Sequence, residues 1–135
     1  MININFSKWP DYDNTQIQKV QEILSSGKVN YWTGNETKTF ELEFAKYIGS
    51  KKAVALANGS LALTAAYKSI GIRPGERIIT TPRTFIATSL TALELGAEIA
   101  FADVDPDSGA INAETIEPLI NKNTKAISVV HLGGW

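Results

Sequence analysis

KAVALANGSLALTAAYKSI, residues Lys52–Ile70, joins a short apolar run directly to a stretch of helical spacing, with Asn58-Gly59-Ser60 between them. The first amides of a helix have no intrahelical acceptor and lie at the positive end of its dipole. A phosphate placed there is therefore hydrogen-bonded and charge-matched. Gly59 allows close approach of the backbone, and Ser60 adds a hydroxyl. Taken alone, an ordinary strand-to-helix turn with Ser60 as N-cap explains these residues at least as well.

From Lys52 onward the sequence alternates between apolar runs and segments of helical spacing, which is typical of an α/β fold. The predicted strands are almost continuously apolar, as in a mostly parallel sheet covered by helices on both faces. Ligands of such sheets bind at the carboxyl ends of the strands, so the residues that follow each strand are candidates for a site. We predict strands at 53–57, 77–80, 98–103 and 125–130, and helices at 60–70, 84–95 and 113–121.

Two further helices are predicted before this region, at 15–26 and 36–48, each followed by a glycine suited to a helix C-terminus. Asn35 is available as the cap of the second helix. We expect the aromatic residues of that helix, which recur at helical spacing, to lie in the core; they are Phe40, Phe44 and Tyr47. The chain is thus expected to divide into an N-terminal helical segment, residues 1–50, and an alternating β/α segment, residues 51–135.

The composition of the 135 residues, 44% apolar and 20% charged with a net charge of −1, is that of a soluble globular domain. The charges are scattered, so we expect neither nucleic acid nor a membrane as a partner. The absence of cysteine excludes disulfides, thiolate metal sites and a cysteine nucleophile, and we expect no metal site. No apolar leader or run of membrane-spanning length is found, and we predict a cytoplasmic protein.

Several short motifs follow one another along nearly the whole chain. They include Tyr31-Trp32-Thr33-Gly34, Asn58-Gly59-Ser60-Leu61, Thr84-Phe85-Ile86-Ala87-Thr88, Asp103-Val104-Asp105-Pro106 and His131-Leu132-Gly133-Gly134. In this order and spacing the chain resembles the start of a DegT/StrS-type sugar-nucleotide aminotransferase. Such enzymes use pyridoxal phosphate and have the aspartate aminotransferase fold, fold type I. The resemblance implies that the chain is the N-terminal part of the large domain of such an enzyme.

The same resemblance assigns a cofactor site. Gly59, Ser60 and Leu61 match the residues that hold the cofactor phosphate through backbone amides and a hydroxyl, and family members commonly have Thr where Ser60 stands. Phe85 matches the aromatic residue that stacks on the pyridine ring, for which offset ring geometry contributes about 0.5–1.5 kcal/mol beyond burial. The alternative for Phe85 is a core residue at the start of a helix.

Other polar and aromatic residues at the strand ends have weaker claims. Asp103 and Asp105 are paired carboxylates, but Asp105-Pro106-Asp107 is first of all a turn sequence, so we do not expect a chemical role. His131, the only histidine, is a candidate contact of the cofactor or substrate, but we favour a hydrogen-bonded structural histidine. Tyr31 and Trp32 fit either a sugar-nucleotide cleft or packing under the next helix.

The lysine that forms the Schiff base is expected beyond Trp135, as is the carboxylate that pairs with the pyridine nitrogen. Lys51 and Lys52 precede the first predicted strand and so stand at the wrong end of the sheet. Lys68 lies roughly 12 Å along the helix from Ser60 at about 1.5 Å per residue. We therefore expect no catalytic residue in this chain and no activity from it alone. The predicted strand 53–57 is also expected to lack its usual neighbours, which are later strands in that fold.

For the parent enzyme the resemblance implies transfer of an amino group, from glutamate, to a nucleotide-linked keto-sugar, by a homodimer. One alternative is a dehydratase of the same family, in which His replaces the lysine. Another is a non-catalytic fragment or binding module that retains the phosphate cradle. A dinucleotide-binding domain is disfavoured because the turn after the first predicted strand lacks the spaced glycines of that fingerprint.

Overall fold

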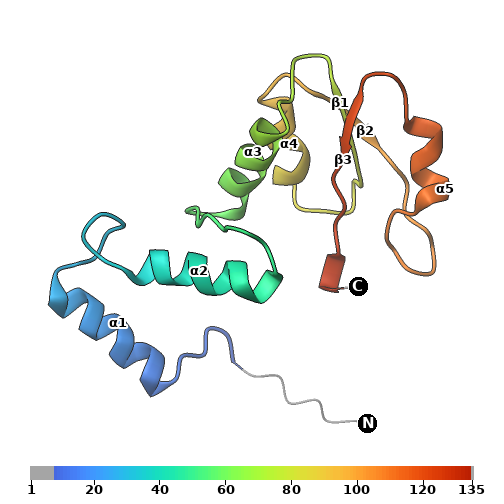
Figure 1. Ribbon diagram of the computed structural model, residues 1–135. Coiled ribbons are helices and arrows are strands. Elements are labelled where there is room, and N and C mark those ends of the chain that lie inside the picture. The colour runs from blue at the N-terminus through green and yellow to red at the C-terminus, as the bar shows by residue number, and fades with distance from the viewer. Residues whose placement is uncertain (1–7, 135) are drawn as a thin grey trace, which may run out of the picture. The chain divides into compact units, whose positions relative to one another are not determined.

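The computed structural model describes residues 8–134 (Figure 1). The chain divides after Ala55 into two compact units, which are described separately below. Residues 1–7 of the predicted N-terminal segment, and Trp135, lie outside the described residues.

The first unit contains two helices, α1 (Asn14–Ser26) and α2 (Glu36–Ile48). A capping box starts α1: the Gln16 amide donates to Asp13 Oδ1 at 2.8 Å, and the Asp13 amide donates to Gln16 Oε1 at 2.9 Å. Both helices end at a left-handed glycine, Gly27 or Gly49, as their sequences predict. Asn35 precedes α2, but its side chain makes no capping hydrogen bond.

The aromatic residues of α2 are exposed, and the prediction that they form a core is wrong. Phe40 and Phe44 stack on each other with ring centroids 5.5 Å apart, and Tyr47 is 85% exposed. Among the described residues of this unit only Ala45 is buried. The apolar stripe therefore has the helical period that the sequence predicts, but two helices provide too little surface to cover it.

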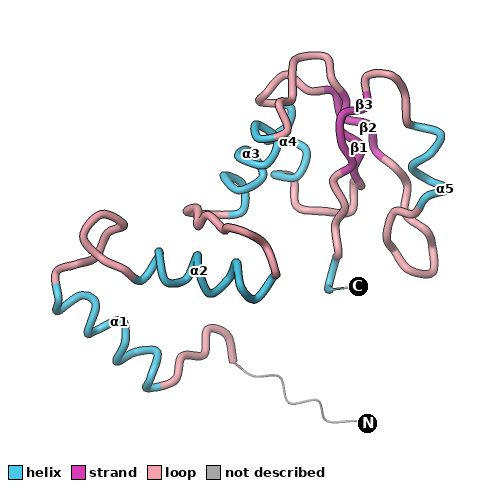
Figure 2. The backbone as a smooth tube through the Cα atoms, viewed as in Figure 1, coloured by secondary structure: helices cyan, strands magenta, loops and turns pink. Residues whose placement is uncertain are grey.

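The second unit is built around a parallel sheet of three strands, β1 (Arg77–Thr80), β2 (Glu98–Phe101) and β3 (Thr124–Ile127), in the order β2-β1-β3. Ile78 is opposite Ile99 on one side and Ala126 on the other. Figure 2 shows α3 (Gly59–Ser69) and α4 (Ala87–Leu93) on one side of the sheet and α5 (Ala113–Ile116) on the other. This is the parallel arrangement that the apolar runs predict.

The predicted strand at 53–57 does not form, because no strand among residues 8–134 pairs with it. A strand depends on hydrogen bonds from a neighbour, and apolar residues alone cannot supply them. The amide of Ala55 instead donates to Glu41 Oε1 at 2.8 Å. The resemblance to the family predicts that this segment lacks its neighbouring strands, and without them residues 53–57 form a loop.

Other elements are shorter than predicted. Helix α4 begins at Ala87, so Thr84 and Phe85 lie in the loop before it. Strands β2 and β3 end at Phe101 and Ile127, although single hydrogen bonds continue the pairing from the Ala102 and Ser128 amides. The predicted helix 113–121 is α5 followed by a 3₁₀ turn, η1 (Glu117–Leu119). A short turn with a left-handed Gly133, η2 (Leu132–Gly134), follows β3.

The core lies where α3 and α4 pack on the sheet. Tyr67, Ile78, Ala92 and Ala97 form its buried cluster. The Tyr67 hydroxyl donates to the Thr88 carbonyl at 2.9 Å and so ties α3 to α4. Ile79 points to the opposite face and is also fully buried. Both faces of the central strand β1 are therefore covered, which fixes the positions of the loops at its ends.

Candidate cofactor site

The start of α3 and the loop after β1 lie at the same edge of the second unit. All three strands are parallel, so their carboxyl ends meet at one edge, and Figure 1 shows that α3 and α4 both begin there. This is the edge at which open α/β sheets bind ligands. The four residues predicted to contact the cofactor, Gly59, Ser60, Leu61 and Phe85, thus belong to segments at one edge of the second unit.

Asn58 is the N-cap of α3. The alternative in which Ser60 caps this helix is therefore wrong. The Asn58 backbone is extended, and its Oδ1 accepts a hydrogen bond from the Leu61 amide at 3.0 Å. Its carbonyl accepts the Ala62 amide at 3.1 Å. Among residues 8–134 we find no acceptor for the amides of Gly59 and Ser60, nor a partner for the Ser60 hydroxyl. These three donors are therefore free to bind an anion, whereas Leu61 must first give up its bond to Asn58.

Gly59 provides the open space that an anion needs. It adopts a helical conformation, so its backbone does not require glycine, and a Cβ placed there would meet nothing within 4 Å. Neither strain nor packing inside the unit explains a glycine at this position. A ligand that approaches the backbone closely would explain it. The cradle therefore fits a phosphate group.

Phe85 is 75% exposed and so does not lie in the core of the second unit. Its backbone is held in the loop before α4, where its carbonyl accepts the Thr88 amide at 3.1 Å. The neighbouring Thr84 hydroxyl bonds the Thr88 hydroxyl at 3.0 Å. A large aromatic ring is thus presented to its surroundings from an anchored backbone. That it covers a heterocycle stays a prediction.

Two features of the loop after β1 were not predicted from the sequence. One is a concave surface beside the loop, and the other is the role of Arg83, which belongs to the loop. The concavity has a volume of about 320 Å³ and is lined by Thr81, Pro82, Thr84, Ile86, Ser89 and Phe101. Arg83 reaches away from its own loop, and its Nη1 donates to the Gly109 carbonyl at 2.9 Å. The sequence shows only that Arg83 follows a proline, Pro82, and this does not identify Gly109 as its hydrogen-bond partner.

The two aspartates behave as the turn interpretation predicts. Asp105 Oδ1 accepts both the amide and the hydroxyl of Ser108, at 2.8 and 2.9 Å. These hydrogen bonds, the amide's above all, lower the pKa of Asp105 below its ordinary value. Asp103 Oδ1 accepts the Val104 amide at 2.8 Å. His131 follows β3 and is exposed, and its carbonyl accepts the Gly134 amide at 3.0 Å.

In the first unit Tyr31 donates to Glu41 Oε2 at 3.2 Å, and Lys38 Nζ lies 5.3 Å from the Tyr31 ring centroid. The negative charge of Glu41, and then its hydrogen bond to the phenol, raise the pKa of Tyr31 above its ordinary value. Trp32 is 86% exposed and packs edge-to-face on Tyr31, so it is not buried under the next helix. A role for both residues in a substrate cleft stays a prediction.

Of the three lysines considered in the sequence, Lys68 has the expected placement, whereas the strand that Lys51 and Lys52 were expected to precede does not form. Lys68 lies in the last turn of α3, at the opposite end from Gly59. Lys51 and Lys52 belong to the first unit and line a concavity on α2 with Lys38 and Glu41. The placement of Lys68 therefore does not support this lysine as a partner of the predicted phosphate cradle.

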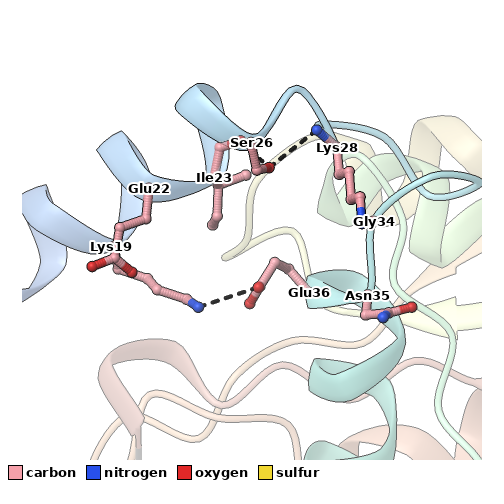
Figure 3. A pocket seen from close by; sticks show the side chains of 8 residues that line it. All are labelled: Lys19, Glu22, Ile23, Ser26, Lys28, Gly34, Asn35 and Glu36. Carbon is pink, nitrogen blue, oxygen red and sulfur yellow. Dashed lines mark hydrogen bonds and ion pairs between the residues drawn. The ribbon is translucent and has the colours of Figure 1, made fainter.

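The first unit has a second concavity, of about 270 Å³, between α1 and the segment 28–36 (Figure 3). Lys19 Nζ and Glu36 Oε1 form an ion pair 3.2 Å long across it, and Ser26 Oγ accepts the Lys28 amide at 3.1 Å. Both charged side chains are more than half exposed, so this pair contributes at most about 1 kcal/mol. The charges neutralise each other and give no preference for an anion.

The sequence profile of the DegT/DnrJ/EryC1/StrS aminotransferase family matches residues 10–135. The chain belongs to this family. The family resemblance drawn from the motifs is thereby confirmed, and so is the α/β class of the fold, the N-terminal part of the large domain of a pyridoxal-phosphate-dependent transferase.

Similar proteins of this family include the spore coat polysaccharide biosynthesis protein SpsC of Bacillus subtilis, 40% identical over 119 residues, which cover 88% of this chain and 30% of SpsC. The crystal structure of an aminotransferase from Psychrobacter cryohalolentis matches with a TM-score of 0.93 and 44% identity, over 97% of this chain and 33% of that one. A putative sugar aminotransferase, Spr1654 of Streptococcus pneumoniae, solved in a PLP form, matches with a TM-score of 0.87 and 30% identity, over 98% and 33% of the two chains.

The chain therefore spans about a third of the length of these relatives. Pyridoxal phosphate is the cofactor that the family implies, and the cradle at Gly59 and Ser60 fits its phosphate. Within residues 8–134, no helix has both the length and the apolar character needed to cross a membrane.

Proposed function

We propose that this chain supplies the phosphate cradle and the ring-stacking residue of a pyridoxal-phosphate aminotransferase. The observation that carries the proposal is the start of α3, where the amides of Gly59 and Ser60 and the Ser60 hydroxyl have no protein partner among the described residues. Charge-assisted hydrogen bonds from such donors are about twice as strong as neutral ones. The exposed ring of Phe85, in the loop between β1 and α4, supports the proposal.

When bound, pyridoxal phosphate supplies a ring that accepts electrons while an amino group passes from donor to acceptor. The residues of this chain bind and orient that group. In our proposal Gly59 and Ser60 fix the phosphate, Leu61 adds its amide when Asn58 releases it, and the Phe85 ring lies against the heterocycle. The lysine that moves protons is proposed to lie beyond Trp135, so the chain alone is inactive.

The substrate we propose is a nucleotide-linked keto-sugar, with glutamate as amino donor. The names of two relatives support a sugar substrate, since one is a polysaccharide biosynthesis protein and another a putative sugar aminotransferase. A homodimeric, cytoplasmic parent enzyme that binds neither nucleic acid nor membranes is part of the same proposal. Two alternatives from the sequence analysis remain: a dehydratase of the same family, and a binding module without activity.

The test compares pyridoxal phosphate with pyridoxal, its analogue without phosphate, as ligands of the 135-residue chain. Fluorescence titration should show binding of the phosphorylated form that is at least about tenfold tighter, since hydrogen bonds to a charged group contribute about 1.5–3 kcal/mol. Equal affinity for the two would refute the cradle.

Assays with glutamate and nucleotide-linked keto-sugars separate the reactions. Amino-sugar formation by the parent enzyme supports transamination, whereas loss of a hydroxyl without nitrogen incorporation identifies the dehydratase. Amino transfer by the 135-residue chain itself would show that the proposed lysine is not needed.

A further inference from the structure

Arg83 joins two loops that are distant in the sequence but follow neighbouring strands. It lies in the loop after β1, between Thr81 and Phe85, and its Nη1 donates to the carbonyl of Gly109 in the loop after β2, at 2.9 Å. The hydrogen bond spans 26 positions of sequence. Neither the motifs of the chain nor its proposed cofactor site assigns a role to this arginine.

Two independent features require glycine at position 109, and one of them involves Arg83. The φ of Gly109, +66°, lies in the left-handed region, where residues with a Cβ are strained. A Cβ built on it would also collide with the guanidinium of Arg83. The arginine therefore occupies the space that any side chain at position 109 would need, and the two residues form one structural unit.

The Gly109 end of this contact is fixed by its own loop. The Gly109 amide donates to the Asp105 carbonyl at 2.8 Å, and the Asp105 amide donates to the Ala110 carbonyl at 2.9 Å. Asp105 Oδ1 in addition accepts the amide and hydroxyl of Ser108. The carbonyl that Arg83 reaches is therefore a point held by the loop around it.

The Arg83 end is anchored as well, whereas the Phe85 side chain is not held by packing. The Arg83 amide donates to Thr81 Oγ1 at 3.0 Å, and Thr81 is 3% exposed at the end of the buried strand β1. The Phe85 side chain, two positions further on, is mostly exposed. Since packing does not hold this ring, its place depends on the backbone of residues 81–86.

We infer that Arg83 is a positioning residue: its bond to Gly109 holds the 81–86 loop, and with it the ring of Phe85, in one place. The consequence for cofactor binding rests on the proposed function, whereas the coupling of the two loops does not. Arg83 touches neither substrate nor cofactor in this account and acts through Phe85.

The test uses amide hydrogen exchange on the 135-residue chain, with the Thr84 amide, which donates to the Pro82 carbonyl at 3.0 Å, as reporter. Arg83→Met should raise its exchange rate by about threefold to tenfold, the equivalent of one lost hydrogen bond. Gly109→Ala, made in the other loop, should raise it as much, and the double variant should add nothing. Arg83→Lys keeps one donor and should restore most of the protection. Arg73→Met, which removes an arginine from a turn at the other end of the sheet, should change nothing.

Pyridoxal phosphate titrations of the same variants give the second readout. Arg83→Met should weaken binding about threefold or more and reduce the induced circular dichroism of the cofactor, while the affinity for inorganic phosphate stays constant. Unchanged exchange at Thr84 in both Arg83→Met and Gly109→Ala would overturn the inference, whatever the cofactor does. Failure of the unaltered chain to bind pyridoxal phosphate would instead refute the proposed function, and the exchange data would still decide the role of Arg83.

Discussion

Asn58 and Leu61 are joined by a hydrogen bond of 3.0 Å from the Leu61 amide to the Asn58 side chain. This bond starts α3 and determines which of its amides remain for a ligand. With the Ala62 amide bonded to the Asn58 carbonyl, the donors left at this end are those of Gly59 and Ser60. The helix is thus stable without an anion, and its first two amides remain available to one.

Gly59→Ala should separate stability from binding. Alanine is a better helix former than glycine by roughly 0.5–1 kcal/mol, and a Cβ at this position meets nothing within 4 Å, so the free energy of unfolding should not fall. The added methyl should hinder the approach of phosphate to the backbone and weaken its binding. Urea unfolding and phosphate titration measure the two effects. Lower stability together with unchanged phosphate affinity would contradict the role given to Gly59.

Tyr31 should titrate at higher pH than an ordinary tyrosine because Glu41 disfavours its phenolate. A pKa raised in the folded state means that this interaction stabilises the fold below the pKa of the unfolded chain and is lost as the pH rises through the folded value. Glu41→Gln should bring the Tyr31 titration down toward about pH 10. The measurement is an NMR titration of the labelled Tyr31 ring. Glu43→Gln, the next acidic residue of α2, is the control and should leave Tyr31 unchanged; an equal shift in both variants would exclude a specific pair.

Tyr67→Phe should lower the free energy of unfolding by about 1 kcal/mol. The variant removes the buried hydroxyl that bonds the Thr88 carbonyl, while the ring stays in the core between α3 and α4. Chemical denaturation gives the value. Tyr47→Phe, which removes an exposed hydroxyl, is the matched control and should cost close to nothing. A loss below about 0.3 kcal/mol would mean that the bond between the two helices contributes little.

The parts of the fold that sequence predicts well are those that depend on near neighbours in the chain. Helix α2 has the predicted bounds, and it ends at the predicted glycine, Gly49. Strand 53–57 was predicted from the same kind of pattern and is absent. A helix supplies its own hydrogen bonds, whereas a strand needs a partner whose position the local sequence does not encode.

The same distinction, between features set by neighbouring residues and features set by distant ones, applies to the candidate site. The start of α3 was found because a cap, a glycine and a hydroxyl are adjacent in sequence. Phe85 was identified from a family motif, and only the structure shows that its ring is exposed. Arg83 and Gly109 were not paired, since their contact depends on the order of β1 and β2 in the sheet. Likewise, no local signal distinguishes the exposed Phe40 and Phe44 from core residues.

The most direct test of the account titrates the chain with inorganic phosphate and with pyridoxal phosphate, in Ser60→Ala and Phe85→Ala variants. Ser69→Ala, at the other end of α3, and Tyr47→Ala are the matched controls. Ser60→Ala should weaken both ligands by about tenfold, as expected for a hydrogen bond to a charged group. Phe85→Ala should weaken pyridoxal phosphate by about threefold or more and leave inorganic phosphate unchanged. Identical affinities for pyridoxal phosphate in the unaltered chain and both variants would contradict the account.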